Sequence, residues 1–136
     1  MNNPVSKIFN DLSKNQKMSV MNLLTSIAVS DGTGPNPDRE IQELNSFVEA
    51  LNVHNGECEI YFKNNGYERI IEDLKDLSEQ KLEFLVVCAW DLIICDGKPT
   101  QEELLRAGQL FEAIGVSDKK FVSIVQKSQA FMKKFT

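Results

Sequence analysis

The fold of this chain is decided by the stretch Leu77-Ser-Glu-Gln-Lys-Leu-Glu-Phe-Leu-Val-Val-Cys-Ala-Trp-Asp-Leu-Ile-Ile-Cys-Asp-Gly97. Its run from Phe84 to Cys95 is apolar except for Asp91, and it is shorter than the ~20 residues that a membrane-spanning helix needs. Ser78 is placed as an N-cap, and Asp96-Gly97 is a stop signal. The stretch therefore predicts a buried core helix over about 78–95.

A related pattern occurs earlier in the chain. Setting Leu12-Ser13 on Leu77-Ser78, an offset of 65 residues (77 minus 12), also sets Asp31-Gly32 on Asp96-Gly97 without a gap. After two residues are removed from the first loop, the segment 47–53 aligns with 110–116. We expect two copies of a helical hairpin, about 12–74 and about 77–135, to pack about a pseudo-twofold axis into one domain, 1–136.

Helical periodicity dominates the rest of the sequence and predicts an all-α domain of about seven to eight helices. The expected helices span about 14–30, 37–51, 56–64, 67–75, 78–95 and 100–114, with a last one from Ser117. Outside 78–95, the residues expected on their buried faces are Met18, Met21, Leu24, Ile27, Ala28, Ile41, Leu44, Phe47, Val48, Leu51, Ile60, Tyr61, Ile70, Ile71, Leu74, Phe121, Ile124, Val125, Phe131, Met132 and Phe135.

Composition narrows the function. With 136 residues, 42% of them hydrophobic, the chain can bury one core without disulfides or a structural metal. A net charge of −5 argues against binding to nucleic acid. The N-terminus lacks the apolar stretch of a secretory signal, which predicts a cytoplasmic protein without a transmembrane segment. Cys88 and Cys95 lie seven residues apart on one helix, too far for a disulfide, so reduced thiols are expected.

The repeated motif resembles that of the TerB-like domains, the tellurite-resistance family. The matching residues are Ala28-Val-Ser-Asp-Gly32 with Glu40, and Ile94-Cys-Asp-Gly97 with Glu103; the resemblance covers roughly residues 12–135. It implies an all-helical interaction module with a role in bacterial stress response or assembly. It also implies a divalent-cation site, for Ca²⁺ or Mg²⁺, carried by Asp31, Glu40, Asp96 and Glu103.

The same four residues have a structural interpretation. Aspartate before glycine caps turns, and a glutamate in the first turn of a helix interacts favourably with the helix dipole. An EF-hand is excluded, because positions one and three of a loop ending at Glu103 would be Leu92 and Ile94, which have no ligand oxygen. Asp91, inside the apolar run, must be paired, solvated or protonated.

Three functions remain open. The first is a non-enzymatic module, monomeric or weakly dimeric, whose acidic segment 38–59 binds a protein partner; this segment has six acidic residues and Arg39 as its one base. The second is a small metal-dependent hydrolase that uses the acidic cluster. The third is a purely structural helical domain.

His54 with Cys58 makes at most half a zinc site, so a surface histidine is expected. Trp90 is expected in the core.

Overall fold

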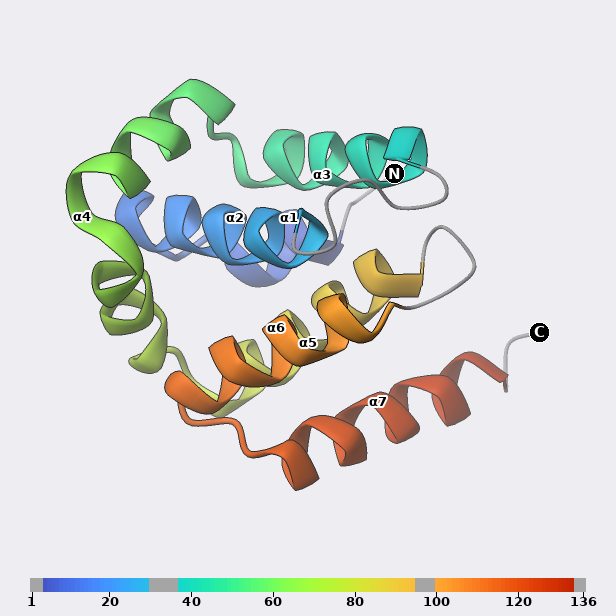
Figure 1. Ribbon diagram of the computed structural model, residues 1–136. Helices are drawn as coiled ribbons and strands as arrows, with labels where there is room; N and C mark the ends of the chain where they lie inside the picture. The colour runs from blue at the N-terminus through green and yellow to red at the C-terminus, as the bar shows by residue number, and fades with distance from the viewer. Residues whose placement is uncertain (1–3, 30–36, 95–99, 134–136) are drawn as a thin grey trace.

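The structure, a computed structural model, describes residues 4–29, 37–94 and 100–133; within these ranges the side chains of 4, 37–40 and 128–133 are not described. The described residues form seven helices and no strand, which confirms the all-α prediction (Figure 1). They are α1 (Pro4–Phe9), α2 (Lys14–Ala28), α3 (Pro37–Leu51), α4 (Asn55–Lys75), α5 (Glu79–Ile94), α6 (Gln101–Ala113) and α7 (Asp118–Lys133). The pseudo-twofold relation between the halves stays a prediction.

Local signals set most of the helix boundaries. Ser13 caps α2, where its Oγ accepts the Gln16 N–H while the Gln16 side chain accepts the Ser13 N–H. Ser78 and Ser117 cap the starts of α5 and α7 through one hydrogen bond each, which their Oγ atoms accept from the N–H groups of Lys81 and Lys120. Gly115, at φ 101°, follows the end of α6 in the left-handed region that glycine adopts without strain.

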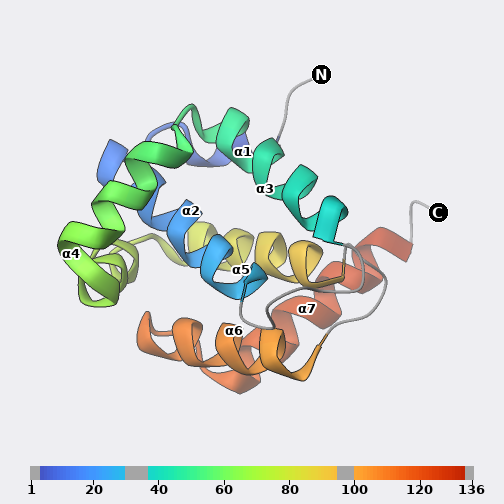
Figure 2. The ribbon, with the colours of Figure 1, turned by 45° about the horizontal axis from the view of Figure 1, so that its top comes forward.

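The core is built around α2 and α5. Figure 2 shows these two helices in the middle of the bundle, with α3 and α4 on one side and α6 and α7 on the other. The helix α2 contacts α3, α4, α5 and α6, so it carries buried residues around most of its circumference. The predicted core helix 78–95 is α5, where Leu85, Val86, Ala89 and Leu92 are fully buried. Cys58 and Cys88 are free and buried, as expected; Cys95 lies outside the described residues.

The helix α4 is kinked. Gly66 has φ 70° and ψ −173°, a non-helical conformation, so the predicted break between 56–64 and 67–75 is confirmed within one helical element. A polar cluster spans this kink: Tyr61, before it, donates its hydroxyl proton to Asp73 Oδ2, after it, over 2.6 Å. Ser19 of α2 donates to the same oxygen over 2.7 Å. The two halves of α4 are thereby fixed to each other and to α2.

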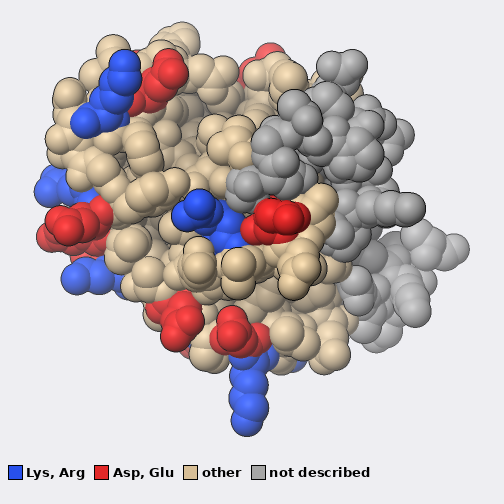
Figure 3. Space-filling model, in the orientation of Figure 1, with Lys and Arg blue, Asp and Glu red and all other residues tan. Residues whose placement is uncertain are grey.

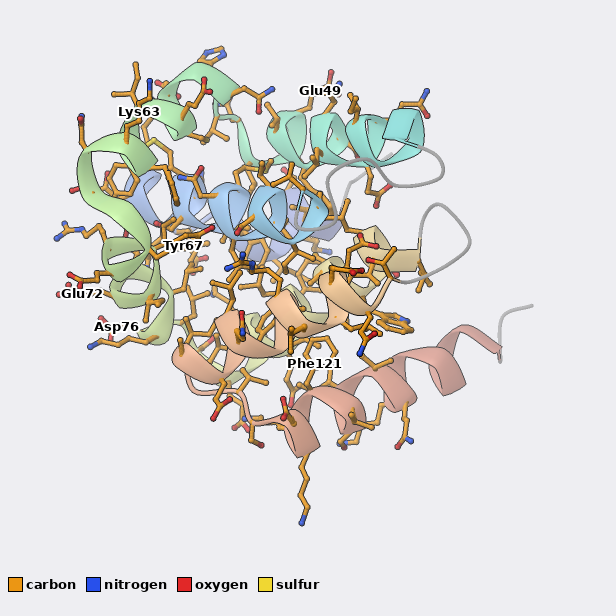
Figure 4. All side chains as sticks on the ribbon, viewed as in Figure 1. Glu49, Lys63, Tyr67, Glu72, Asp76 and Phe121 are labelled. Carbon is orange, nitrogen blue, oxygen red and sulfur yellow. The ribbon has the colours of Figure 1, made fainter. Side chains whose placement is uncertain are left out.

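A second hydrogen bond of α4 reaches α2 just after the kink. The hydroxyls of Tyr67 and Ser26 lie 2.7 Å apart, and Tyr67 lies on the side of α4 that faces α2 (Figure 4). Its ring also meets Phe62 edge to face, with centroids 4.9 Å apart. The face of α4 that packs on α2 is therefore partly polar, and its hydrogen bonds fix the position of α4 relative to α2.

The prediction of a buried position is wrong for two residues. Ile41 is 55% exposed, and the buried residues of the described part of α3, Phe47 and Leu51, lie in its C-terminal half. Ile60 is 61% exposed, because it lies two residues, about 200° around the helix, from the buried Cys58. The other expected core residues whose side chains are described are buried or partly buried. Phe131, Met132 and Phe135 lie outside the described side chains.

Within the described ranges, none of the helices combines the length and the apolar character that crossing a membrane requires.

Candidate functional site

The predicted cation ligands are Asp31, Glu40, Asp96 and Glu103. Asp31 and Asp96 lie outside the described residues, and Glu40 is in the first turn of α3 with its side chain not described. Glu103, in the first turn of α6, is the only one of the four whose side chain is described. The predicted ligation by these four residues therefore stays a prediction.

Glu103 forms the predicted capping box. Its side chain is fully buried, and its Oε1 accepts hydrogen bonds from the Thr100 N–H, at 3.3 Å, and the Thr100 hydroxyl, at 3.0 Å. Thr100 Oγ1 in turn accepts the Glu103 N–H over 3.1 Å. Each residue thus satisfies a backbone donor of the other at the start of α6. This geometry bears out the structural role that the sequence assigns to Glu103.

Two acidic side chains that the cation motif does not contain, Asp91 on α5 and Glu43 on α3, interact electrostatically. Asp91 is exposed on α5, yet its pKa is raised, first by partial desolvation and then by the negative charge of Glu43 on α3. Both charges also raise the pKa of the Cys88 thiol, after the larger effect of its burial. Glu43 follows Glu40 by three residues and therefore lies on the same side of α3. This spacing was the sequence signal that could have added Glu43 to the acidic residues near the predicted cation site. Among the described residues, no group of three acidic, histidine or cysteine side chains could hold a metal ion.

Neutralising Asp91 should stabilise the protein at pH 7. A carboxyl with a raised pKa is less favourable when charged in the folded state than in the unfolded state, so its stability contribution increases as the pH falls through the folded pKa. We expect Asp91→Asn to raise the melting temperature by about 1–3 °C in cation-free buffer, a small effect because the side chain is exposed and screened. Differential scanning calorimetry measures it, and Glu83→Gln, exposed on the same helix, is the matched control.

The same measurement tests the cation prediction. Millimolar Mg²⁺ or Ca²⁺ should raise the melting temperature of the wild type, and the combined Asp31→Asn and Asp96→Asn change should remove that rise. An unchanged wild-type melting temperature would argue for the capping interpretation alone.

A lower melting temperature for Asp91→Asn would contradict the repulsion between Asp91 and Glu43.

The other feature is an apolar face on α6 and α7, here called the α6–α7 face. It comprises Leu104, Leu105, Gly108, Phe121 and Val122. The space-filling view shows uncharged surface over these helices, with acidic and basic side chains beside it (Figure 3). Leu105 is 63% exposed and Val122 is 51% exposed. Phe121 lies between the two helices (Figure 4), where its ring centroid is 5.5 Å from that of Phe111.

Two adjoining cavities hollow the α6–α7 face. One, of about 370 Å³, lies along α6 as far as Gln101 and Glu112; the other, of about 400 Å³, lies between α6 and α7 against Trp90. Leu104, Gly108 and Asp118 line both. Together the cavities form a groove of the size and apolar character that binding sites have. The sequence signals were Leu105 and Val122, apolar residues outside the predicted buried stripes.

Trp90 forms one wall of this groove. It is partly buried and packs against the core, as predicted, but it also lines the 400 Å³ cavity. Its indole Nε1 is buried and has no hydrogen-bond partner in the described part of the chain. The single tryptophan of the protein therefore has both a core position and a surface-groove position.

His54 and Cys58 do not form a metal pair. His54 is exposed just before α4, where its N–H donates to Glu57 Oε2 over 3.2 Å, which confirms the surface histidine. Cys58 is buried, and burial raises the pKa of its thiol to about 11. A protonated, buried thiol is a poor metal ligand, because ligation requires the thiolate.

Comparisons with known proteins gave no match: no protein-family model matches the chain, and neither a curated protein nor a solved structure does.

Proposed function

We propose that this protein is a non-enzymatic interaction module of the TerB-like type, which binds a protein partner through the α6–α7 face. The duplicated helix, Asp-Gly, helix order supports the family, and with it the role in bacterial stress response or assembly. The observation that carries the binding function is the groove: exposed leucine and valine side chains surround a concave apolar surface, an arrangement typical of protein–protein contact sites.

The acidic segment 38–59 is the alternative binding surface. Glu49 and Glu59 are exposed on α3 and α4, and Glu49 points away from the bundle (Figure 4). A basic partner would meet these charges without contacting the groove. The two surfaces lie on different helices, so they can be changed independently.

Affinity capture with two matched variants separates these surfaces. We expect Leu105→Asp with Val122→Asp, which places charges on the groove, to lose the proteins that the wild type retains from an extract of its native cells. Glu49→Lys with Glu59→Lys should retain them. All four positions are exposed, so the circular dichroism spectra and melting curves of both variants should match the wild type. Retention by the first variant and loss by the second would move the binding site to segment 38–59.

A further inference from the structure

We propose that the occupant of the α6–α7 face is an amphipathic helix of a partner protein, with an apolar face and basic flanks, about three turns long. This inference rests on the proposed function and names the chemistry of the partner. It is carried by the periodicity of the groove, the charges at its edge and the position of Gly108.

The shape of the groove fits a helix. Its lining residues on α6 recur at steps of three and four, and they cover one side of the helix from Gln101 to Glu112. This span of eleven residue steps is about 17 Å long, the length of about three helical turns. The second wall comes from α7, through Phe121, Val122 and Val125. A third helix laid between two helices buries side chains from both, as in helix-in-groove recognition.

The charges at the groove favour a basic partner. Glu112 and Asp118 line it with exposed carboxylates, and neither takes part in an ion pair among the described residues. Glu112 is also in the last turn of α6, where the helix dipole disfavours a negative charge. Lysine or arginine side chains on the flanks of the bound helix would compensate both carboxylates. An acidic helix would be repelled.

Gly108 keeps the groove open. A helix with glycine in its interior is less stable than the same helix with alanine there, so a glycine at this position calls for an explanation. Close helix packing is not the reason, because a Cβ built on Gly108 would meet one neighbour within 4 Å, Asp118 Oδ1 at 3.4 Å. Gly108 lines both cavities instead, and a side chain larger than a methyl group would extend into the space that the two cavities share. The missing side chain leaves room for an apolar side chain of the partner.

Trp90 provides the reporter for the test. It is the only tryptophan and lines the groove, so a tryptophan-free peptide bound there should change its fluorescence. The probes are two 18-residue helical peptides with the same leucine face, one with lysine and one with glutamate on the polar face. We expect saturable micromolar binding of the lysine peptide and binding of the glutamate peptide at least tenfold weaker at low salt.

Variants of the groove make the test specific. Gly108→Leu should abolish binding of the lysine peptide, whereas Gly108→Ala should preserve it and raise the melting temperature by about 2–4 °C through helix propensity. Glu112→Gln with Asp118→Asn should weaken binding about tenfold. Ile60→Asp, on the exposed side of α4, should leave it unchanged. Binding that persists in Gly108→Leu, or equal binding of both peptides, would overturn the proposal.

Two outcomes separate this inference from the proposed function. If Leu105→Asp with Val122→Asp loses the native partners but the two peptides bind equally, the face binds a partner of different chemistry and only the inference fails. If light scattering shows a wild-type dimer that Leu105→Asp converts to a monomer, the occupant is a second copy of this chain, which also overturns the inference. If the captured partners are unaffected by the face variant, the proposed function fails.

Discussion

Replacing Asp73 by alanine should lower the free energy of unfolding by about 3 kcal/mol, a fall in melting temperature of roughly 10 °C. The Asp73 carboxylate accepts the hydroxyl protons of Ser19 and Tyr61, and Ser19 is fully buried. Arg69 Nε lies 3.4 Å from its other oxygen. Alanine would leave the Ser19 hydroxyl buried without its acceptor and would remove the cluster that joins the two halves of α4. Urea unfolding at pH 7 measures the change.

Two comparisons make this prediction specific. Glu72→Ala, at the neighbouring exposed position of the same helix, should change stability by less than about 0.5 kcal/mol. Tyr61→Phe should cost about 1 kcal/mol alone and less in the Asp73→Ala background, where the Tyr61 hydroxyl keeps only the hydrogen bond that it accepts from Arg69 Nε. Additive effects, or equal costs for Asp73→Ala and Glu72→Ala, would show that the cluster does not stabilise α4 on α2.

Raising the pH from 9 to 11 should destabilise the wild type by about 2 kcal/mol more than a Cys58→Ala variant. Burial raises the pKa of the Cys58 thiol from 9.0 to about 11. Below pH 9 the thiol is protonated in both states, and its contribution to stability is fully present. Between pH 9 and 11 it ionises only in the unfolded state, so the folded state loses stability relative to the unfolded one.

Urea unfolding in reducing buffer at half-unit pH steps gives the free energy of unfolding as a function of pH for the wild type and for the Cys58→Ala variant. Above pH 10 the wild type should lose further stability, because burial and the hydrogen bond to Asp73 also raise the pKa of Tyr61. Cys88 acts in the same direction, since burial raises its pKa as well. These contributions are common to both proteins, so the difference between the curves isolates Cys58. Parallel curves would mean that Cys58 ionises equally in the folded and unfolded states.

Helix positions followed from local signals. Ser13, Thr100 and Gly115 mark helix ends through hydrogen bonds or backbone angles that involve neighbours within a few residues, so the sequence was sufficient to place them. The break at Gly66 was predictable for the same reason, because glycine adopts positive φ without strain. The capping role of Glu103 also depends on a partner three residues away.

The exposed and buried sides of the helices were only partly predictable. Periodicity assigns a stripe to each helix, but how far along the helix that stripe is covered depends on the neighbouring helices. Ile41 and Ile60 are exposed because no neighbour in the described part of the chain covers their sides of α3 and α4. Leu105 and Val122 are exposed for the same reason, and this exposure, rather than the acidic motif, defines the groove.

The sequence by itself determined the helical class, most of the helix ends after α1 and the capping box at Glu103, because these depend on periodicity and on contacts a few residues apart. The short helix α1 was not predicted. Only the tertiary structure decided that Asp73 joins Ser19 and Tyr61, that the charge of Glu43 raises the pKa of Asp91, and that Gly108 opens a groove beside Trp90. Each of these arrangements brings together side chains from different helices or from the two sides of a kink. Their proximity arises from helix packing, which local sequence patterns do not specify.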